Sequence, residues 1–473
     1  MRHLIIMDAR TERFKDWLRS STIDVSPNIE IENLSEQHMG RGVVAIKPIA
    51  SGETLFTIPR PMILNVATSQ LVIDKPDILE KLLNLGQWPA LIIVLLYELS
   101  VVKEKSSWWD YLQVLPFTEN EVKLNQLIFW EPEELELLLP SLVNERVDRA
   151  SSEKMYKDVK HLVKEWNLGF EVDSELFHRV ATTIMSYSFD VERPDADDES
   201  LESDSMPEIQ ADGYYKSLVP LADTLNADTE FHNAHLEYNE GTLVMKATKD
   251  IEVGEQIFNT YAEHSNSELL RRYGYVQVHG SQYDFGEVPF TKVYDQFKDH
   301  VDFEVIKEAL SLIADEDDDD EDNQGICHES YDCFATGEVE IELILLVQVL
   351  SIAAQIENVD IAMVKRIYHK CYQLVESKRV TKKMAENFSN IIASRLSDYE
   401  NVVENPEIAI TRKQMAEIVK IGEKRALVAA SNPANSLILQ GDPLSSIDDA
   451  KLIRNITKKR MNDGTESATK RLK

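Results

Sequence analysis

Cysteines and long apolar runs are both scarce in this 473-residue sequence, and each scarcity excludes a class of protein. Three cysteines are too few for a disulfide framework, and no signal peptide opens the chain, so we expect a reducing intracellular compartment. Cys327 precedes His328 and Cys333 follows, but no second ligand pair stands at zinc spacing, so no metal site is expected. The longest apolar stretch, near Ala90–Leu96, is far too short to span a bilayer, so no membrane role is expected.

Basic residues are also in short supply. The chain has 50 lysines and arginines against 83 acidic residues, which gives a net charge of −33. Much of the excess lies in residues 190–212, with ten acids and one base, and in the run of eight acids Asp315–Asp322. Such a surface repels nucleic-acid phosphates and attracts basic partners. We therefore expect a basic protein substrate and no direct nucleic-acid binding, although the acidity alone could serve solubility.

Two similar β-patterns stand about two hundred residues apart. In the first, strands at 42–49 and 54–58 flank a turn at Gly52-Glu53. In the second, strands at 243–251 and 256–260 flank Gly254-Glu255, with a phenylalanine at the same offset. We interpret these patterns as two hairpins of one β-domain that is interrupted by an insertion. Chance is the alternative, because Gly-Glu turns between apolar strands are common.

Helical periodicity fills most of the remaining chain. A short amphipathic helix is expected at 8–21, with Phe14, Trp17 and Leu18 on one face. Further helices are expected at 87–105, 132–139, 154–166, 174–186, 338–356, 361–376, 382–396 and 412–428. The two acidic segments are expected to be solvated loops.

A glycine-rich segment, His38-Met39-Gly40-Arg41-Gly42, precedes the first of these strands. A phosphate-binding loop must open a helix, but here a strand and a proline follow, so a dinucleotide loop is not predicted. A glycine loop between strands instead allows the backbone to approach a ligand closely.

The segment from Ser186 to Tyr275 carries the most informative motifs. They are Ser186-Tyr187-Ser-Phe189, Asp223-Thr-Leu-Asn226, His232-Asn233, Asn259-Thr-Tyr261 and Tyr273-Gly-Tyr275. In order and spacing, together with Gly40-Arg41-Gly42 and Trp108–Pro116, they resemble the split SET domain of the Rubisco and ribosomal-protein lysine methyltransferases. Within that family the sequence is most similar to the fungal ribosomal lysine methyltransferases of type 4.

The resemblance implies an α+β fold. A split, mostly-β SET domain would occupy residues 22–285, interrupted by a helical insert at about 80–175 and an acidic loop at about 190–212. An all-α domain at 286–448 would bind substrate, and residues 449–473 would form a basic tail.

The resemblance also implies a cofactor and site residues. S-adenosyl-L-methionine would be bound by nine residues: Met39, Gly40, Arg41, Gly42, Asp223, Asn226, Tyr261, Tyr273 and Tyr275. Tyr261 would stand at the methyl-transfer position, and Ser186, Tyr187 and Asp223 would line the channel for the target lysine. The family often has Asn-His where this chain has Asn226-Ala227, and His232-Asn233 is a candidate to fill part of that space.

These residue types suit methyl transfer. A neutral lysine nitrogen attacks a methyl group on sulfonium, so alignment is the main demand and can supply roughly 7–11 kcal/mol. The lysine, whose unperturbed pKa is about 10.4, must first lose a proton. Burial in an apolar channel beside a sulfonium favours the neutral amine, so no dedicated base is required. The hydroxyl of Tyr261 can make one hydrogen bond while its ring forms a wall of the channel.

The implied substrate is a lysine in a large-subunit ribosomal protein. Two alternatives remain open: a histidine methyltransferase of the actin type, and a non-catalytic binding module with the same fold. Two basic clusters, Lys458–Arg460 and Lys470–Lys473, are typical of a two-part nuclear import signal, or form an ordinary solvated tail. We expect a nuclear location, with the cytoplasm as a second one.

Overall fold

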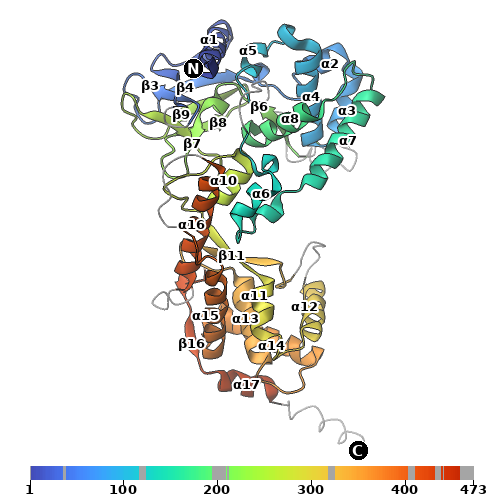
Figure 1. Cartoon of the computed structure of the whole chain (residues 1–473), viewed down its shortest axis with the longest axis vertical. Helices are drawn as coiled ribbons and strands as arrows, with labels where there is room; N and C mark the ends of the chain where they lie inside the picture. The colour runs from blue at the N-terminus through green and yellow to red at the C-terminus, as the bar shows by residue number, and fades with distance from the viewer. Residues whose placement is uncertain are drawn as a thin grey trace, which may run out of the picture. The chain divides into compact units, whose positions relative to one another are not determined.

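The computed structural model describes residues 2–35, 39–116, 124–193, 209, 212–317, 325–402, 411–431, 438–439 and 441–458. The chain divides into two compact units (Figure 1). The first comprises Met1–Leu137, Val143–Ser281 and Ile408–Met415, and the second comprises Leu138–Leu142, Gln282–Glu407 and Ala416–Lys473. Each unit has a hydrophobic core of its own.

Two four-stranded sheets form the β-part of the first unit. One has the strand order β1-β4-β9-β8, and the other has the order β2-β3-β10-β7. The first sheet consists of β1 (Asp24–Val25), β4 (Thr54–Pro59), β9 (Thr242–Ala247) and β8 (Ala234–Tyr238). The second consists of β2 (Ile29–Asn33), β3 (Arg41–Ala45), β10 (Gln256–Asn259) and β7 (Asn226–Ala227). Side chains along β9 alternate between buried and half-buried, as expected for a strand with one face in a core.

The two similar β-patterns belong to this one β-domain, but they are not hairpins, and that prediction is wrong. β3 pairs with β10 and β4 pairs with β9, so each strand finds its partner in the other copy. Equivalent backbone bonds recur 202 residues apart: Gly52 N–H donates to Ala247 O at 2.8 Å, and Gly254 N–H donates to Ala45 O at 2.7 Å. Ile49 and Ile251 bond each other reciprocally between these two pairs. The turns therefore carry the chain from one sheet to the other, which local sequence does not reveal.

Helices make up the rest of the first unit. They are α1 (Arg2–Ser20), α2 (Gln70–Asp74), α3 (Leu79–Leu83), α4 (Gln87–Tyr97), α5 (Trp109–Leu112), α6 (Pro132–Leu135), α7 (Arg149–Glu165), α8 (Ser174–Tyr187) and α10 (Asn266–Tyr273). Phe14, Trp17 and Leu18, which were predicted to share one face of this helix, all pack against the core, with Trp17 only partly buried. α4 is buried along almost its whole length and packs beside α8 (Figure 1). Asp148 and Asp173 cap the first turns of α7 and α8, as polar residues at such positions commonly do.

The first acidic segment begins as a strand. β5 (Ser188–Glu192) pairs antiparallel with β6 (Tyr214–Leu218), so Asp190 and Glu192 lie in a ladder and not in a loop. The central part of this segment, residues 194–208 and 210–211, lies outside the described residues.

The second unit is mainly helical, as predicted for the C-terminal region. Its helices are α11 (Phe290–Phe297), α12 (Phe303–Asp317), α13 (Ile341–Ala353), α14 (Ile361–Glu376), α15 (Lys382–Ser397), most of α16 (Arg412–Ser431) and α17 (Asp449–Thr457). α13 is buried from Leu343 to Ala353 and forms the centre of the core. No described helix of either unit is both long and apolar enough to cross a membrane.

An all-α description of this unit is too simple. β11 (Phe285–Pro289) pairs with β12 (Ser330–Phe334), and β13 (Arg379–Thr381) pairs with β16 (Ser445–Ile447). A third short pair joins β14 (Ile438–Leu439) and β15 (Asp442–Pro443). β12 alternates strictly, with Tyr331 and Cys333 fully buried, which is a period-two pattern within a helical region. The second acidic run also starts in a helix, since α12 continues to Asp317, and residues 318–324 lie outside the described residues.

Candidate active site

The parallel pairing of β7 with β10 brings distant parts of the chain together. It places Asn226 opposite Phe258 and Ala227 opposite Asn259, the first residue of the Asn259-Thr-Tyr261 motif. The Nδ2 of Asn226 donates a hydrogen bond of 3.1 Å to the carbonyl oxygen of Arg41, which is 185 residues earlier in the chain. The glycine-rich loop and the Asp-x-x-Asn motif are therefore directly joined.

The two glycines of the loop have opposite surroundings. Gly40 adopts a φ of +66°, which favours glycine, and a Cβ there would meet no atom within 4 Å. Gly42 has no room for a side chain, because a Cβ would lie 2.5 Å from Leu34 Cδ1, 2.7 Å from Gln256 Nε2 and 2.9 Å from Asn226 Nδ2. The loop is thus open at Gly40 and packed tightly at Gly42, while the side chain of Met39 beside it is 43% exposed.

Arg41 is held by protein groups on both sides of its guanidinium. Its Nε donates to Thr11 Oγ1 on α1 at 2.8 Å, and its Nη1 donates to the carbonyl oxygen of Val114, just after α5, at 2.7 Å. These bonds fix the side chain, so what Arg41 offers Asn226 is its backbone carbonyl.

Three tyrosines form one aromatic cluster. The rings of Tyr261 and Tyr273 stack with centroids 4.7 Å apart, and the ring of Tyr275 meets Tyr273 edge-on at 6.5 Å. The hydroxyl of Tyr261 donates to Leu225 O at 2.9 Å, and that of Tyr275 donates to Ala227 O at 3.4 Å, so both hold the backbone on either side of Asn226. Burial raises the pKa of all three hydroxyls above the ordinary value, so the cluster stays uncharged at neutral pH.

Asp223 is a buried carboxyl beside this cluster. It lies in the short 3₁₀ helix η10 (Ala222–Thr224), and its Oδ2 accepts a hydrogen bond from the hydroxyl of Tyr111 on α5. Burial raises the pKa of Asp223 to about 7, although the bond from Tyr111 acts in the opposite direction. Asp223 can therefore change its charge near neutral pH.

Ser186 and Tyr187 end α8, the helix that leads into β5. The hydroxyl of Ser186 donates to Arg272 O at 2.7 Å and accepts from Gln126 Nε2 at 2.9 Å. Ser186 is thereby joined to the residue that precedes Tyr273. Tyr187 is half-buried against the core, and it lies close enough to Tyr261 to contribute to the raised pKa of that tyrosine.

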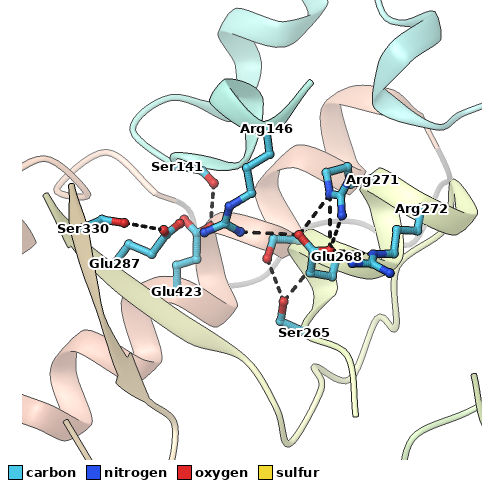
Figure 2. Close-up of polar contacts among 10 residues, drawn as sticks. Ser141, Arg146, Ser265, Glu268, Arg271, Arg272, Glu287, Ser330 and Glu423 are labelled. Carbon is cyan, nitrogen blue, oxygen red and sulfur yellow. Dashed lines mark hydrogen bonds and ion pairs between the residues drawn. The ribbon is translucent and has the colours of Figure 1, made fainter. Parts of the chain in front are cut away.

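An ion-pair cluster fixes the helix that carries Tyr273 (Figure 2). Glu268 on α10 contacts Arg271 at 2.7 Å, Arg272 at 2.9 Å and Arg146 at 3.4 Å. Burial raises the pKa of Glu268, but the hydrogen bonds and charges of Arg271 and Arg272 outweigh it and lower the pKa to about 2. Glu268 is therefore a permanent anion at physiological pH, and it holds α10 to the insert.

Comparison with known proteins places this chain in a family. The SET domain family matches residues 40–262. Ribosomal lysine N-methyltransferase 4 of Saccharomyces cerevisiae is 38% identical over 98% of this chain and 98% of its own length. This chain belongs to the SET-domain lysine methyltransferases. A second member, the N-lysine methyltransferase setd6 of Xenopus laevis, is 31% identical over 56% of this chain and 57% of its own length.

Solved structures of SET-domain lysine methyltransferases have the same fold. The structure of Rubisco LSMT bound to AdoMet covers 89% of this chain and 90% of its own, with a TM-score of 0.62 at 16% identity. The SET domain of LSMT bound to lysine and AdoHcy covers 90% of both chains with a TM-score of 0.60 at 17% identity. The predicted α+β SET fold is confirmed.

This SET-domain enzyme has Ala227 where the family often has a histidine after the asparagine. The contact that the structure shows at this position is made by the backbone. Ala227 contributes its carbonyl to Tyr275, which needs no side chain at 227. Asn233 does not substitute for the missing histidine: its Oδ1 accepts from Phe258 N at 2.8 Å and its Nδ2 donates to Gln256 O at 3.0 Å. It fixes β10 instead. The Nδ1 of His232 is buried without a hydrogen-bond partner in the described structure.

Two residues that contact the site were not among the predicted site residues. Tyr111 lies inside the Trp108–Pro116 motif, so that motif was the available signal. Gln126 is 3% exposed and donates to Ser186, but nothing in the sequence around it marks it. Both lie in the helical part between the two β-patterns, and their partners are 112 and 60 residues away.

Proposed function

We propose that this enzyme transfers methyl groups from S-adenosylmethionine to the side-chain amine of a lysine in a large-subunit ribosomal protein. The observation that carries the proposal is the 38% identity, end to end, with a protein named as a ribosomal lysine N-methyltransferase. The net charge of −33 agrees with it, since ribosomal proteins are rich in lysine and arginine.

The residues present fit the cofactor. S-adenosylmethionine supplies an electrophilic methyl group on a positively charged sulfur. The open backbone at Gly40 allows close approach of a ligand, and a side chain at Gly42 would fill space against Asn226. The Nε2 of Gln256, next to Gly42, is buried without a hydrogen-bond partner in the described structure, so a donor remains available for a polar ligand.

The protein's own groups supply alignment and, at the three tyrosines, uncharged walls. Tyr261 is fixed by its bond to Leu225 and by stacking on Tyr273, so its ring is a rigid wall. Its hydroxyl stays protonated, because burial raises its pKa, and it therefore keeps donating to Leu225. A lysine amine that enters among three uncharged tyrosines is disfavoured as an ammonium ion, which leaves its lone pair free to attack. Correct placement then accounts for most of the rate enhancement.

The test is a methyl-transfer assay with purified protein and isolated ribosomal subunits. Radiolabel from S-adenosylmethionine is expected in one band of the large subunit, and Tyr261→Phe should serve as the control of reduced activity. Mass spectrometry of that band should place the methyl on lysine. A methyl on histidine, or label confined to small-subunit proteins, would contradict the proposal. Lysine methylation of ribosomes from cells with and without the protein should differ at the same residue.

A further inference from the structure

We propose that Tyr111 is a positioning residue for methyl transfer, acting through its hydrogen bond to Asp223. This inference rests on the proposed function. Tyr111 is completely buried and its hydroxyl points at a carboxyl that is itself 6% exposed. A buried charge-assisted hydrogen bond of this kind fixes both partners more firmly than a bond between neutral groups.

The N-terminal helix holds Tyr111 in place. The ring of Tyr111 packs against Phe14 at 5.8 Å and stacks on Trp17 at 6.2 Å, both on α1. Trp17 in turn donates its indole N–H to Ser107 O at 2.8 Å, two residues before α5 begins. α1 and α5 therefore form one block, which we call the brace (residues 11–17 and 107–114).

The same brace holds the glycine-rich loop. Arg41 reaches Thr11 on α1 and the carbonyl of Val114 at the end of the α5 segment. Its backbone carbonyl accepts from Asn226, three residues after Asp223. The brace thus contacts the site at two points, the loop through Arg41 and the 223–226 segment through Tyr111. The first half of the brace precedes residues 40–262, which match the SET domain family.

The bond also controls the charge next to the tyrosine cluster. The groups that face the Asp223 carboxyl are Tyr111 on α5, the hydroxyl of Thr224 and the amide of Asp223 itself, and its charge is felt at Tyr261. Tyr111 stabilises the ionised form, because it donates to the carboxylate. Loss of that hydroxyl should raise the pKa of Asp223 further, so that a larger fraction is neutral at pH 7. An ionised Asp223 favours a cationic ligand, so affinity for S-adenosylmethionine should rise with pH through this transition.

Calorimetric titration with S-adenosylmethionine between pH 6 and 9 tests the inference without any protein substrate. The midpoint of the rise in affinity should move to higher pH in Tyr111→Phe, and the rise should disappear in Asp223→Asn. The matched control is Tyr97→Phe, which removes a similar bond from Tyr97 on α4 to Asp74 on α2 (2.9 Å). Identical affinity profiles for Tyr111→Phe, Tyr97→Phe and wild type would overturn the inference.

Turnover gives a second, independent readout. We expect kcat of Tyr111→Phe to fall about tenfold, as misplacement of reacting groups predicts, with the KM of the protein substrate changed less than about threefold. The double variant Tyr111→Phe/Asp223→Asn should be no slower than Asp223→Asn alone, because the two residues act as a pair. Additive losses would overturn the inference. Absence of ribosomal methylation by the wild type would instead refute the proposed function, and the calorimetric result would still decide the role of Tyr111.

Discussion

The hydroxyl of Tyr261 donates its hydrogen bond to the backbone carbonyl of Leu225, the residue immediately before Asn226, at 2.9 Å. Asn226 donates in turn to the carbonyl of Arg41. Three segments that are far apart in the sequence are therefore connected by two hydrogen bonds, and the expected channel for the target lysine requires this convergence.

Replacing Tyr261 by phenylalanine should separate binding from turnover. The ring would still stack on Tyr273, but the bond that fixes it to Leu225 would be lost. We expect kcat to fall roughly fivefold or more, since one such bond contributes about 1 kcal/mol to placement. Cofactor affinity should change little, because the ring keeps its stack on Tyr273. Single-turnover assays and calorimetry measure the two effects. Tyr238→Phe, on the surface of β8, is the control, and equal turnover of both variants would remove Tyr261 from the mechanism.

The sequence alone predicted many of the helices and brought the motifs of the site to attention. Helical periodicity placed a helix at 361–376, the bounds that α14 has. The order of motifs predicted that distant segments converge, and in the structure Asn226 contacts Arg41 while Tyr261 contacts Leu225. Such features could be predicted because periodicity is local, and because a family resemblance fixes which motifs come together.

Strand pairing and buried side-chain partners could not be predicted in the same way. β3 and β4 each look like half of a hairpin, yet each pairs with a strand about two hundred residues away. Which partner each strand takes depends on the direction in which the turns at Gly52-Glu53 and Gly254-Glu255 lead the chain, and not on the residues of the strands. Tyr111 contacts Asp223 across 112 residues and Gln126 contacts Ser186 across 60, and no local spacing encodes those contacts.

Glu268 should make the first unit sensitive to acid. Its pKa in the folded chain is about 2, below the ordinary value of 4.5, so its ionisation stabilises the fold above pH 4.5. That contribution is lost as pH falls from 4.5 towards 2. Glu268→Gln should lower Tm at pH 7 and show less further loss between pH 4.5 and 3 than wild type, in scanning calorimetry. Glu237→Gln, which removes an exposed pair with Lys246, should behave like wild type, and equal losses in both variants would argue against the cluster.

Glu423 should act in the opposite direction in the second unit. It accepts from Ser141 at 2.5 Å (Figure 2). It also accepts from Tyr399 at 2.8 Å, and burial raises its pKa to about 7. Because the folded value lies above 4.5, its contribution to stability is complete below pH 4.5 and is lost as pH rises to 7. Glu423→Gln should therefore flatten the fall in Tm between pH 5 and 8, whereas Glu376→Gln, on the surface of α14, should not. An unchanged slope for Glu423→Gln would show that this carboxyl does not titrate in that range.

We propose that the basic C-terminal segment directs the protein to the nucleus. It carries Lys458–Arg460 and Lys470–Lys473, and residues 459–473 lie outside the described structure. Deletion of 458–473 from a fluorescently tagged chain should shift the signal to the cytoplasm. Replacement of the same basic residues by glutamine should reproduce the shift without shortening the chain. Undiminished nuclear signal in both variants would mean that import does not use these clusters.

The two loop glycines should tolerate alanine very differently, and this difference tests the geometry of the cofactor loop. At Gly42 a methyl group would overlap Leu34, Gln256 and the amide of Asn226, all closer than 3.0 Å, so the contact between Asn226 and Arg41 must shift. Overpacking of this kind costs about 1–3 kcal/mol of unfolding free energy.

Gly42→Ala should therefore lose both stability and affinity for S-adenosylmethionine, as measured by denaturant unfolding and calorimetry. Gly40→Ala has space around it but carries a φ of +66°, so it should lose some stability from backbone strain while Asn226 keeps its bond. Gly241→Ala, in open space and without a positive φ, controls for the substitution itself and should match wild type. If Gly42→Ala bound the cofactor as well as Gly241→Ala does, Asn226 and the loop would not form one binding surface, because a displaced Asn226 could not leave affinity unchanged.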